Sequence, residues 1–312
     1  MKRKTDNFSK FIDRKKNSAV KEAIKQEKRT EKKERQQAIE KRFEEKRKLR
    51  NDKFQSPHHP AVNPQRPSNP DESMPLNKFI AHSGICSRRE AAELVKRGKV
   101  MVNDKLITEP GTKISSADMV KVNGKKISIS KNLVYILINK PKDYITTTED
   151  PQGRKTVLHL IKGATAERVY PIGRLDRNTS GVLLLTNDGE LAQKLAHPKH
   201  EIKKVYHVTL DKSLSKNDFD QIAAGIELED GFASVDAIAY ADAKDKTQVG
   251  LEIHSGRNRI VRRIFESLGY DVRGLDRVMY AGLTKKNVQR GKWRLLTDKE
   301  IRILKYLNSS IK

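Results

Sequence analysis

Residues 170–190 read YPIGRLDRNTSGVLLLTNDGE, and this stretch decides how the second half of the chain is interpreted. It begins with a polar loop in which one carboxylate, Asp176, stands between Arg174 and Arg177. Residues 182–185 follow and predict a buried strand, because the run is short, apolar and bounded by turn residues. A carboxylate flanked by two arginines is ionised at neutral pH, so it is ready to act as a nucleophile or proton acceptor.

The segments around this stretch alternate between strand-like and helix-like patterns. Strands are predicted at residues 133–138, 205–209 and 249–253, and helices at residues 190–195, 219–226 and 260–268. Strands are joined both by turns and by helices, without the strict alternation of a doubly wound parallel sheet. We therefore expect an α+β domain.

The overall charge indicates a polyanionic partner. The chain has 65 Lys and Arg against 40 Asp and Glu, a formal net charge of +25, which favours nucleic acid or an anionic membrane surface. No stretch approaches the roughly 18 apolar residues of a membrane-spanning helix, and no apolar segment follows the basic N-terminus as in a secretory signal. The single cysteine, Cys86, excludes an intramolecular disulfide and a zinc site of paired cysteines. We expect a cytoplasmic protein that binds nucleic acid and no membrane.

Charge and composition divide the chain into three parts. Residues 1–70 hold 22 Lys and Arg against 10 Asp and Glu, with too few apolar side chains to offset the entropy lost on folding. Five prolines between residues 57 and 70 predict a linker. We expect a basic, disordered extension and linker over residues 1–73, a small domain over 74–130 and a larger domain over 131–312. The extension is either a solubilising segment or an arm that contacts RNA.

The small domain combines a helical half with short strands. Ser87, followed three residues later by Glu90, predicts a helix whose first residues cap each other, and Gly98 predicts where that helix ends. Two further dipeptides predict tight turns between strands, and they are Asn103-Asp104 and Asn123-Gly124.

Basic side chains gather on and beside the predicted helix, where they can bind phosphates. The pattern Gly84-Ile85-Cys86-Ser87-Arg88-Arg89-Glu90-Ala91, followed by GKVMVN at residues 98–103, resembles the RNA-binding module of the ribosomal S-four type. That resemblance implies structured RNA as a partner and does not imply a reaction. A solvated helix face is the alternative for each cation. The RNA-binding candidates on this helix are Arg88, Arg89, Lys96 and Arg97.

The stretch 170–190 resembles the catalytic motif of the RsuA/RluB-type ribosomal RNA pseudouridine synthases. Residues 139–148, 203–206 and 256–263 resemble further motifs of that family, in the right order. The resemblance covers about residues 76–300. It implies an isomerase with an S-four-type domain followed by a synthase domain that has a mixed, mainly antiparallel sheet and flanking helices.

The resemblance also implies roles for individual residues. Asp176 is the catalytic carboxylate, Tyr206 packs against the target base, and Arg262 is the cation that holds Asp176 ionised and oriented. Each residue also has a structural alternative: Asp176 could be a turn or cap residue, Tyr206 a core residue of its strand, and Arg262 part of a solvated helix face. In one departure from the family, Ile260 stands where many relatives have Gln or Glu, so a hydrogen bond from that position is in doubt. The RNA-binding candidates of this domain are Arg174, Arg257 and Arg259.

The chemistry agrees with this assignment. Isomerising a uridine requires the base to leave the stack, which costs a few kcal/mol and calls for an aromatic surface in exchange. Asp176 either attacks the sugar covalently or abstracts a sugar proton to give a glycal. The reaction needs no redox step, metal or nucleotide cofactor, and the sequence has neither a phosphate-binding Gly-rich loop nor zinc-ligand spacing.

Three functions compete at this point. The first is a synthase acting on ribosomal RNA, with the large subunit favoured by the long basic extension and by the tail after Gly282. The second is a non-catalytic RNA-binding or ribosome-assembly factor, and the third is a synthase that acts on transfer RNA. The intact loop around Asp176 favours an enzyme, and the resemblance favours ribosomal RNA. We expect a monomer.

Overall fold

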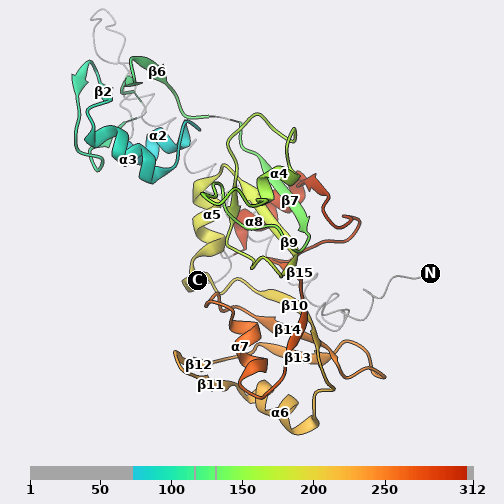
Figure 1. Ribbon diagram of the computed structural model, residues 1–312. Coiled ribbons are helices and arrows are strands. Elements are labelled where there is room, and N and C mark those ends of the chain that lie inside the picture. The colour runs from blue at the N-terminus through green and yellow to red at the C-terminus, as the bar shows by residue number, and fades with distance from the viewer. Residues whose placement is uncertain (1–72, 116, 131, 308–312) are drawn as a thin grey trace, which may run out of the picture. The chain divides into compact units, whose positions relative to one another are not determined.

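The structure is a computed structural model that describes residues 73–115, 117–130 and 132–307 (Figure 1). The extension expected over residues 1–73 lies outside the described residues, apart from Ser73. In these three described ranges, no helix is both long enough and apolar enough to cross a membrane.

The small domain contains helices α2 (Leu76–His82) and α3 (Arg88–Lys96) and two antiparallel sheets. One sheet has the strand order β3-β2-β5-β6, and in the other β1 pairs with β4. The strands are β1 (Met74–Pro75), β2 (Val100–Val102), β3 (Lys105–Leu106), β4 (Lys113–Ile114), β5 (Val120–Val122) and β6 (Lys125–Ile127).

Local sequence rules account for this domain. The Ser87 hydroxyl accepts a hydrogen bond from the Glu90 N–H at 3.3 Å, and the Glu90 carboxylate accepts one from the Ser87 N–H at 2.6 Å. Gly98 takes a left-handed φ of 67° just after α3, the position where glycine is favoured. Both predicted turns have two consecutive residues with positive φ, as two-residue hairpin turns require. The predicted helix and turns are confirmed.

The large domain is built on one nine-stranded sheet. From one edge to the other its main path runs β13-β14-β10-β15-β9-β7-β17, while β16 pairs with β15 and β8 pairs with β9. The strands are β7 (Tyr135–Lys140), β8 (Tyr170–Ile172), β9 (Ser180–Thr186), β10 (Lys204–Leu210), β13 (Ala237–Tyr240), β14 (Gln248–Ile253), β15 (Val272–Tyr280), β16 (Leu283–Thr284) and β17 (Trp293–Leu295).

Strands β9 and β15 form the one parallel pair among the described strands, and this pair joins segments far apart in sequence. Arg277 of β15 lies opposite Gly181 of β9. A Cβ at position 181 would lie 2.2 Å from the carbonyl oxygen of Arg277, and φ at this glycine is +113°. Glycine is therefore required here, because β15 runs too close for any side chain. The expectation of a mixed, mainly antiparallel sheet is confirmed.

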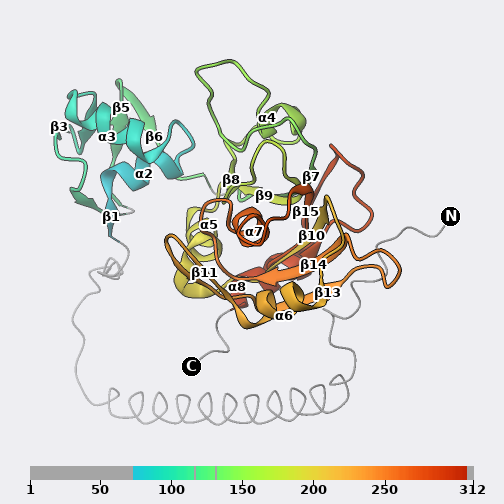
Figure 2. The ribbon, with the colours of Figure 1, turned by 60° about the horizontal axis from the view of Figure 1, so that its bottom comes forward.

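Helices cover both faces of the sheet (Figure 2). Apolar residues of α4, α6 and α7 belong to one core, and those of α5 and α8 belong to a second core on the other face. Strand β7 is buried along its whole length because its alternate residues enter the two cores. The helices are α4 (Val157–Leu160), α5 (Gly189–Ala196), α6 (Lys216–Ala224), α7 (Ile260–Glu266) and α8 (Asp298–Tyr306), with a 3-10 turn, η4 (Pro198–His200).

The helix predicted over residues 219–226 begins and ends earlier than expected. Ser215 caps α6 by accepting a hydrogen bond from the Asp218 N–H, and Gly225, with φ of 100°, ends the helix. Ile226 then begins β11 (Ile226–Leu228), which pairs with β12 (Gly231–Ala233). The apolar side chain of Ile226 fits the helical spacing but enters the core from a strand.

Candidate active site

Asp176 lies on the loop between β8 and β9, where the sequence predicts it. Its side chain is exposed and lines a pocket to which the central strands β10 and β15 also contribute. Within the described residues, no hydrogen bond or ion pair engages its carboxylate. The group is therefore accessible to a ligand in the pocket.

Lys140, the last residue of β7, holds this loop from behind. The side chain is 0% exposed, and its Nζ donates to the carbonyl oxygens of Asp176, Arg177 and Thr179 at 3.0, 3.3 and 2.7 Å. Burial lowers the pKa of Lys140 to about 8, although the carboxylates of Asp176 and Asp143 act in the opposite direction. The buried amine fixes the backbone on which the exposed carboxylate stands.

A second support comes from the loop after β7. The Thr146 hydroxyl accepts a hydrogen bond from the Leu175 N–H at 3.0 Å and donates to the carbonyl oxygen of the same residue. Arg177 pairs with Asp143 at 3.3 Å, and the Asp143 N–H donates to the Arg177 carbonyl at 2.9 Å. The segment 139–148, recognised as a separate motif in the sequence, therefore serves to position the loop of Asp176.

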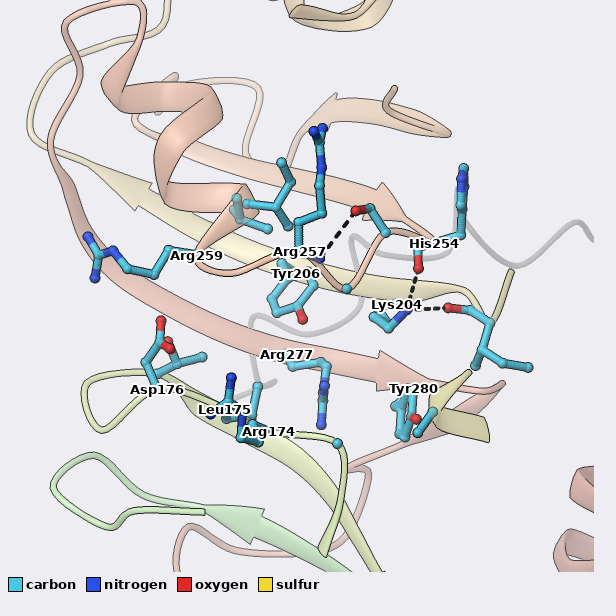
Figure 3. A pocket seen from close by; sticks show the side chains of 18 of the residues that line it. Arg174, Leu175, Asp176, Lys204, Tyr206, His254, Arg257, Arg259, Arg277 and Tyr280 are labelled. Atoms are coloured by element: carbon cyan, nitrogen blue, oxygen red, sulfur yellow. Dashed lines mark hydrogen bonds between the residues drawn. The ribbon is translucent and has the colours of Figure 1, made fainter. Parts of the chain in front are cut away.

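Strands β10 and β15 supply the floor of the pocket (Figure 3). Tyr206 of β10 lies directly opposite Arg277 of β15 in the sheet register, and Lys204 lies opposite Tyr280. A bulge in β15 skips one residue between these two pairs, so all four residues face the pocket. Tyr206 is 8% exposed and presents its ring to the pocket that Asp176 also lines.

Cations predominate in the pocket. Arg174 and Arg259 are exposed on its rim, whereas Lys204 and Arg277 lie deeper. Burial and the nearby Arg277 lower the pKa of Lys204 to about 8. An excess of hydrogen-bond donors around a single carboxylate suits a ligand that is rich in oxygen acceptors, such as a nucleotide.

The arginines predicted in the segment 256–263 differ in their partners and in their exposure. The Arg257 guanidinium is bound by the β11–β12 turn, where it donates to the Asp230 carboxylate at 3.1 Å and to three backbone carbonyls. Arg259 pairs with Glu266 at 3.0 Å and remains exposed on the pocket rim. Ile260, the departure from the family pattern, packs in the core.

Arg262 lies on the other side of Asp176. Both residues line a second hollow, but no ion pair joins them in the described part of the chain. Its Nη1 donates to the carbonyl oxygen of Val272 at 2.8 Å, and its Nε is buried without an acceptor among the described residues. The structure therefore brings Arg262 to the vicinity of the carboxylate without pairing the two groups.

The RNA-binding candidates of the small domain are all exposed on or beside α3. Lys96 forms an ion pair with Glu93 at 3.4 Å, with both side chains largely in solvent. Such a pair contributes little to stability and leaves the cation available. The exposed candidates are Arg88, Arg89, Lys96 and Arg97.

Sequence reasoning missed several residues of the site. Lys140 and Thr146 stand inside a segment whose motif was noticed, but nothing in that segment reveals their contacts. Arg277 and Lys204 were not singled out. Strand β15 was not predicted, because its residues Gly274, Asp276 and Arg277 obscure any apolar alternation. Among the described residues, no three His, Cys, Asp or Glu side chains gather as metal ligands would.

Comparisons with known proteins agree with this geometry. A family model described as RNA pseudouridylate synthase matches residues 134–267, and the S4 domain model matches residues 74–120. Ribosomal large subunit pseudouridine synthase B of Bacillus subtilis is 44% identical over 235 residues, which are 74% of this chain and 96% of that relative. The chain belongs to the RNA pseudouridylate synthase family. As a member of that family, it is an isomerase.

Two further matches support the family assignment. Dual-specificity RNA pseudouridine synthase RluF of Escherichia coli is 35% identical over 234 residues, covering 74% of this chain and 78% of that relative. A solved structure described as "Crystal structure of pseudouridylate synthase" has a TM-score of 0.54 and 28% identity, covering 74% of this chain and 99% of the other. The resemblance to RsuA/RluB-type synthases, the S-four-type domain and the α+β fold are confirmed.

Proposed function

We propose that this synthase converts one uridine of large-subunit ribosomal RNA to pseudouridine, with Asp176 as its catalytic carboxylate. The observation that carries the proposal is an exposed carboxylate on a loop fixed by Lys140 and Thr146, at a pocket that also presents the Tyr206 ring. The printed name of the Bacillus subtilis relative supports the large subunit as the source of the substrate.

The reaction breaks the bond between N1 of uracil and C1′ of the ribose and forms a bond between C5 and C1′. One proton leaves C5 and one is gained at N1, so the conversion is an isomerisation. Asp176 can serve in two ways. It can attack C1′ and be displaced again when C5 attacks, or it can take a proton from the sugar to give a glycal. Both routes place the carboxylate beside the ribose.

The other pocket residues have roles that follow from this placement. The target base leaves the stack and lies on Tyr206, whose ring replaces part of the lost stacking. Arg174 on the rim fills the space that the base vacates or holds the RNA backbone there. Arg262 acts on Asp176 across the second hollow, which both residues line, and the attraction between their charges strengthens when RNA displaces water.

We propose domain boundaries as the sequence predicts them, with an RNA-docking domain over residues 74–130 and a catalytic domain over 131–312. The exposed cations on α3, with Arg259 on the pocket rim, bind phosphates of the same RNA. Arg257 contributes indirectly, since its guanidinium holds the turn between β11 and β12. The protein acts as a monomer in the cytoplasm.

Mapping of pseudouridine across ribosomal and transfer RNA, in cells with and without this chain, tests the proposal. We expect one uridine of large-subunit RNA to lose its modification when the chain is absent and to regain it when the chain is restored. Transfer RNA is included because a synthase that acts on transfer RNA is one of the alternatives that the sequence leaves open.

The variant Asp176→Asn gives the matched control for that experiment. It is nearly isosteric, so it should fold and bind RNA normally, yet restore no pseudouridine. Activity in Asp176→Asn would remove the catalytic role of this residue. If no uridine in any RNA depends on the chain, a non-catalytic role in RNA binding or ribosome assembly replaces the proposal.

A further inference from the structure

Arg277 is a buried cation that the rest of the protein leaves incompletely satisfied. Its side chain is 3% exposed and its Nε donates to the carbonyl oxygen of Val182 at 2.8 Å. Its Nη2 is buried and has no hydrogen-bond acceptor among the described residues. Burying an N–H group without an acceptor is unfavourable, and more so when the group is charged. Such a group is expected in a binding site, where the bound ligand supplies the missing acceptor.

The surrounding charges do not neutralise Arg277. Asp276, its neighbour in the chain, bonds instead to Lys285 and Arg290. Lys204 adds a second cation in the same pocket, and Arg277 helps to lower its pKa. The guanidinium also packs on the Tyr280 ring, with its carbon 4.5 Å from the ring centre. The pocket therefore holds an uncompensated donor against an aromatic wall.

The register of the sheet indicates which part of the substrate would lie beside the Arg277 guanidinium. Arg277 lies directly opposite Tyr206, and side chains in such pairs have their Cβ atoms about 4.5–5.5 Å apart on the same face. Figure 3 shows Arg277 between Leu175 and Tyr280, below the Tyr206 ring. A base lying on that ring would have its edge beside the guanidinium. Phosphates of the RNA stay at the rim, where exposed arginines are available.

We propose that Arg277 donates from Nη2 to a carbonyl oxygen of the target uracil, before and after the base rotates. This inference rests on the function proposed above. Half a turn about the line through N3 and C6 brings C5 to the place of N1 and exchanges the C2 and C4 carbonyls. One fixed donor therefore meets a carbonyl oxygen in both orientations. Cytosine would present its amino group in one of them.

The same contact favours the reaction itself. When the bond between N1 and C1′ breaks, the departing uracil gains negative charge that is shared by its two carbonyl oxygens. A preorganised cationic donor in a buried site stabilises such charge, and loss of one donor of this kind typically lowers the rate about 10²–10³-fold. Arg277 thus recognises the base and stabilises it as a leaving group.

The first test compares Arg277→Gln with Arg294→Gln. Arg294 also makes structural hydrogen bonds, to Glu300 at 2.8 and 2.7 Å, but does not line the pocket. We expect Arg277→Gln to lower the single-turnover rate at saturating RNA about 10²–10³-fold, and Arg294→Gln to leave that rate unchanged. Equal rates for the two variants at matched melting temperature would overturn the assignment.

The decisive test measures whether the Arg277 side chain and a carbonyl oxygen of the target uracil contribute to binding together. The probes are RNA fragments with uridine, 2-thiouridine or 4-thiouridine at the mapped target, bound to Asp176→Asn with and without Arg277→Gln. A thiocarbonyl is a weak acceptor, so one of the two thio substitutions should weaken binding about tenfold when Arg277 is present and hardly at all when it is Gln. If Arg277→Gln fails to fold, Arg277→Lys takes its place, with a reduced penalty expected.

The outcomes separate the two proposals. The thio substitution could weaken binding equally with Arg277 and with Gln at position 277, while the unaltered chain still makes pseudouridine. That result overturns the role of Arg277 and leaves the proposed function standing. Absence of pseudouridine formation by the unaltered chain in every RNA overturns the proposed function and this inference together.

Discussion

Two buried cations near Asp176 and the cations of α3 occupy opposite environments. Lys140 is buried behind the loop of Asp176 and Arg277 is buried in the pocket, whereas Arg88 and Arg89 stand exposed on the small domain. An exposed cation binds any phosphate, and salt screens that attraction. A buried cation is tolerated only with fixed partners, so it imposes a geometry. We therefore expect substitutions in the pocket to change the reaction, and substitutions on α3 to change binding.

The largest effect should follow from a methyl group placed between β9 and β15. Gly181→Ala puts a Cβ 2.2 Å from the Arg277 carbonyl oxygen, so the parallel pair must separate. We expect a loss of at least about 3 kcal/mol in the free energy of unfolding and no detectable activity. Gly173→Ala is the matched control, because its φ is also positive but nothing lies within 4 Å. It should cost about 1–2 kcal/mol. Similar denaturation midpoints for the two variants would contradict the close approach of the strands.

Removing the amine behind the loop should have the next largest effect. Lys140→Met leaves three carbonyl oxygens of the loop without their donor, and we expect it to cost about 2–4 kcal/mol and to lower the rate at saturating RNA far more than it weakens binding. Lys142→Met, at an exposed position two residues away, gives the control. If Lys140→Met kept a normal rate but bound RNA less tightly, Lys140 would serve RNA binding, as the surface cations do, and would not position the loop.

The pKa of Lys140 predicts how pH acts on stability. Burial lowers this pKa to about 8, whereas an unfolded chain keeps the proton up to about pH 10.4. Between these values the unfolded state binds more protons, so this group makes stability rise with pH. Activity should fall over the same window, because a neutral amine has fewer donors for the loop.

Melting temperature and single-turnover rate, both measured from pH 7 to 9.5, check this prediction. Lys140→Met should remove the part of the rise in stability with pH that Lys140 causes, and Lys142→Met should leave the rise unchanged. Lys204→Met is measured beside them, since burial also lowers the pKa of Lys204 to about 8 and its contribution has the same sign. A pH profile unchanged by the substitution at position 140 would show that its proton is not released in this range.

The smallest effect is expected on α3. Replacing Arg88 and Arg89 by Gln should weaken RNA binding severalfold at 0.1 M salt and reduce the slope of log affinity against log salt by up to about 2. The rate at saturating RNA should stay unchanged. The control replaces Lys299 and Arg302, two exposed cations of α8, by Gln. If both pairs lower the salt slope equally, α3 is no more than part of a general basic surface.

Much of the fold could be predicted because it rests on local rules. The reciprocal cap of Ser87 and Glu90, the two hairpin turns and the apolar run at 182–185 each depend on neighbours a few residues apart. The exposed loop of Asp176 was predicted for the same reason. The family resemblance supplied the order of the remaining pieces.

The rest of the site depends on contacts that no local pattern encodes. Arg277 reaches the pocket only because β15 runs beside β9, 96 residues earlier in the chain. The polar residues by which β15 contributes to the pocket also interrupt the apolar alternation from which a strand is predicted. Arg257 shows the opposite difficulty: it stands in a recognised motif, yet its guanidinium is bound within its own domain, to a turn some 26 residues upstream. Which cations serve RNA and which serve the fold is decided by packing.

The parallel pairing of β9 and β15 also has a consequence for the order of events on the ribosome that makes this protein. A nascent chain emerges from its N-terminus, so Asp176 and Tyr206 are synthesised long before Val272–Tyr280. Until that strand docks, the pocket lacks the part of its floor that β15 supplies, and β9 lacks its parallel neighbour. The small domain, by contrast, builds its hydrophobic core from residues 74–129 alone and can form early. The chain can thus acquire its affinity for RNA well before its ability to modify RNA, and catalysis begins only after β15 has been made and has docked beside β9.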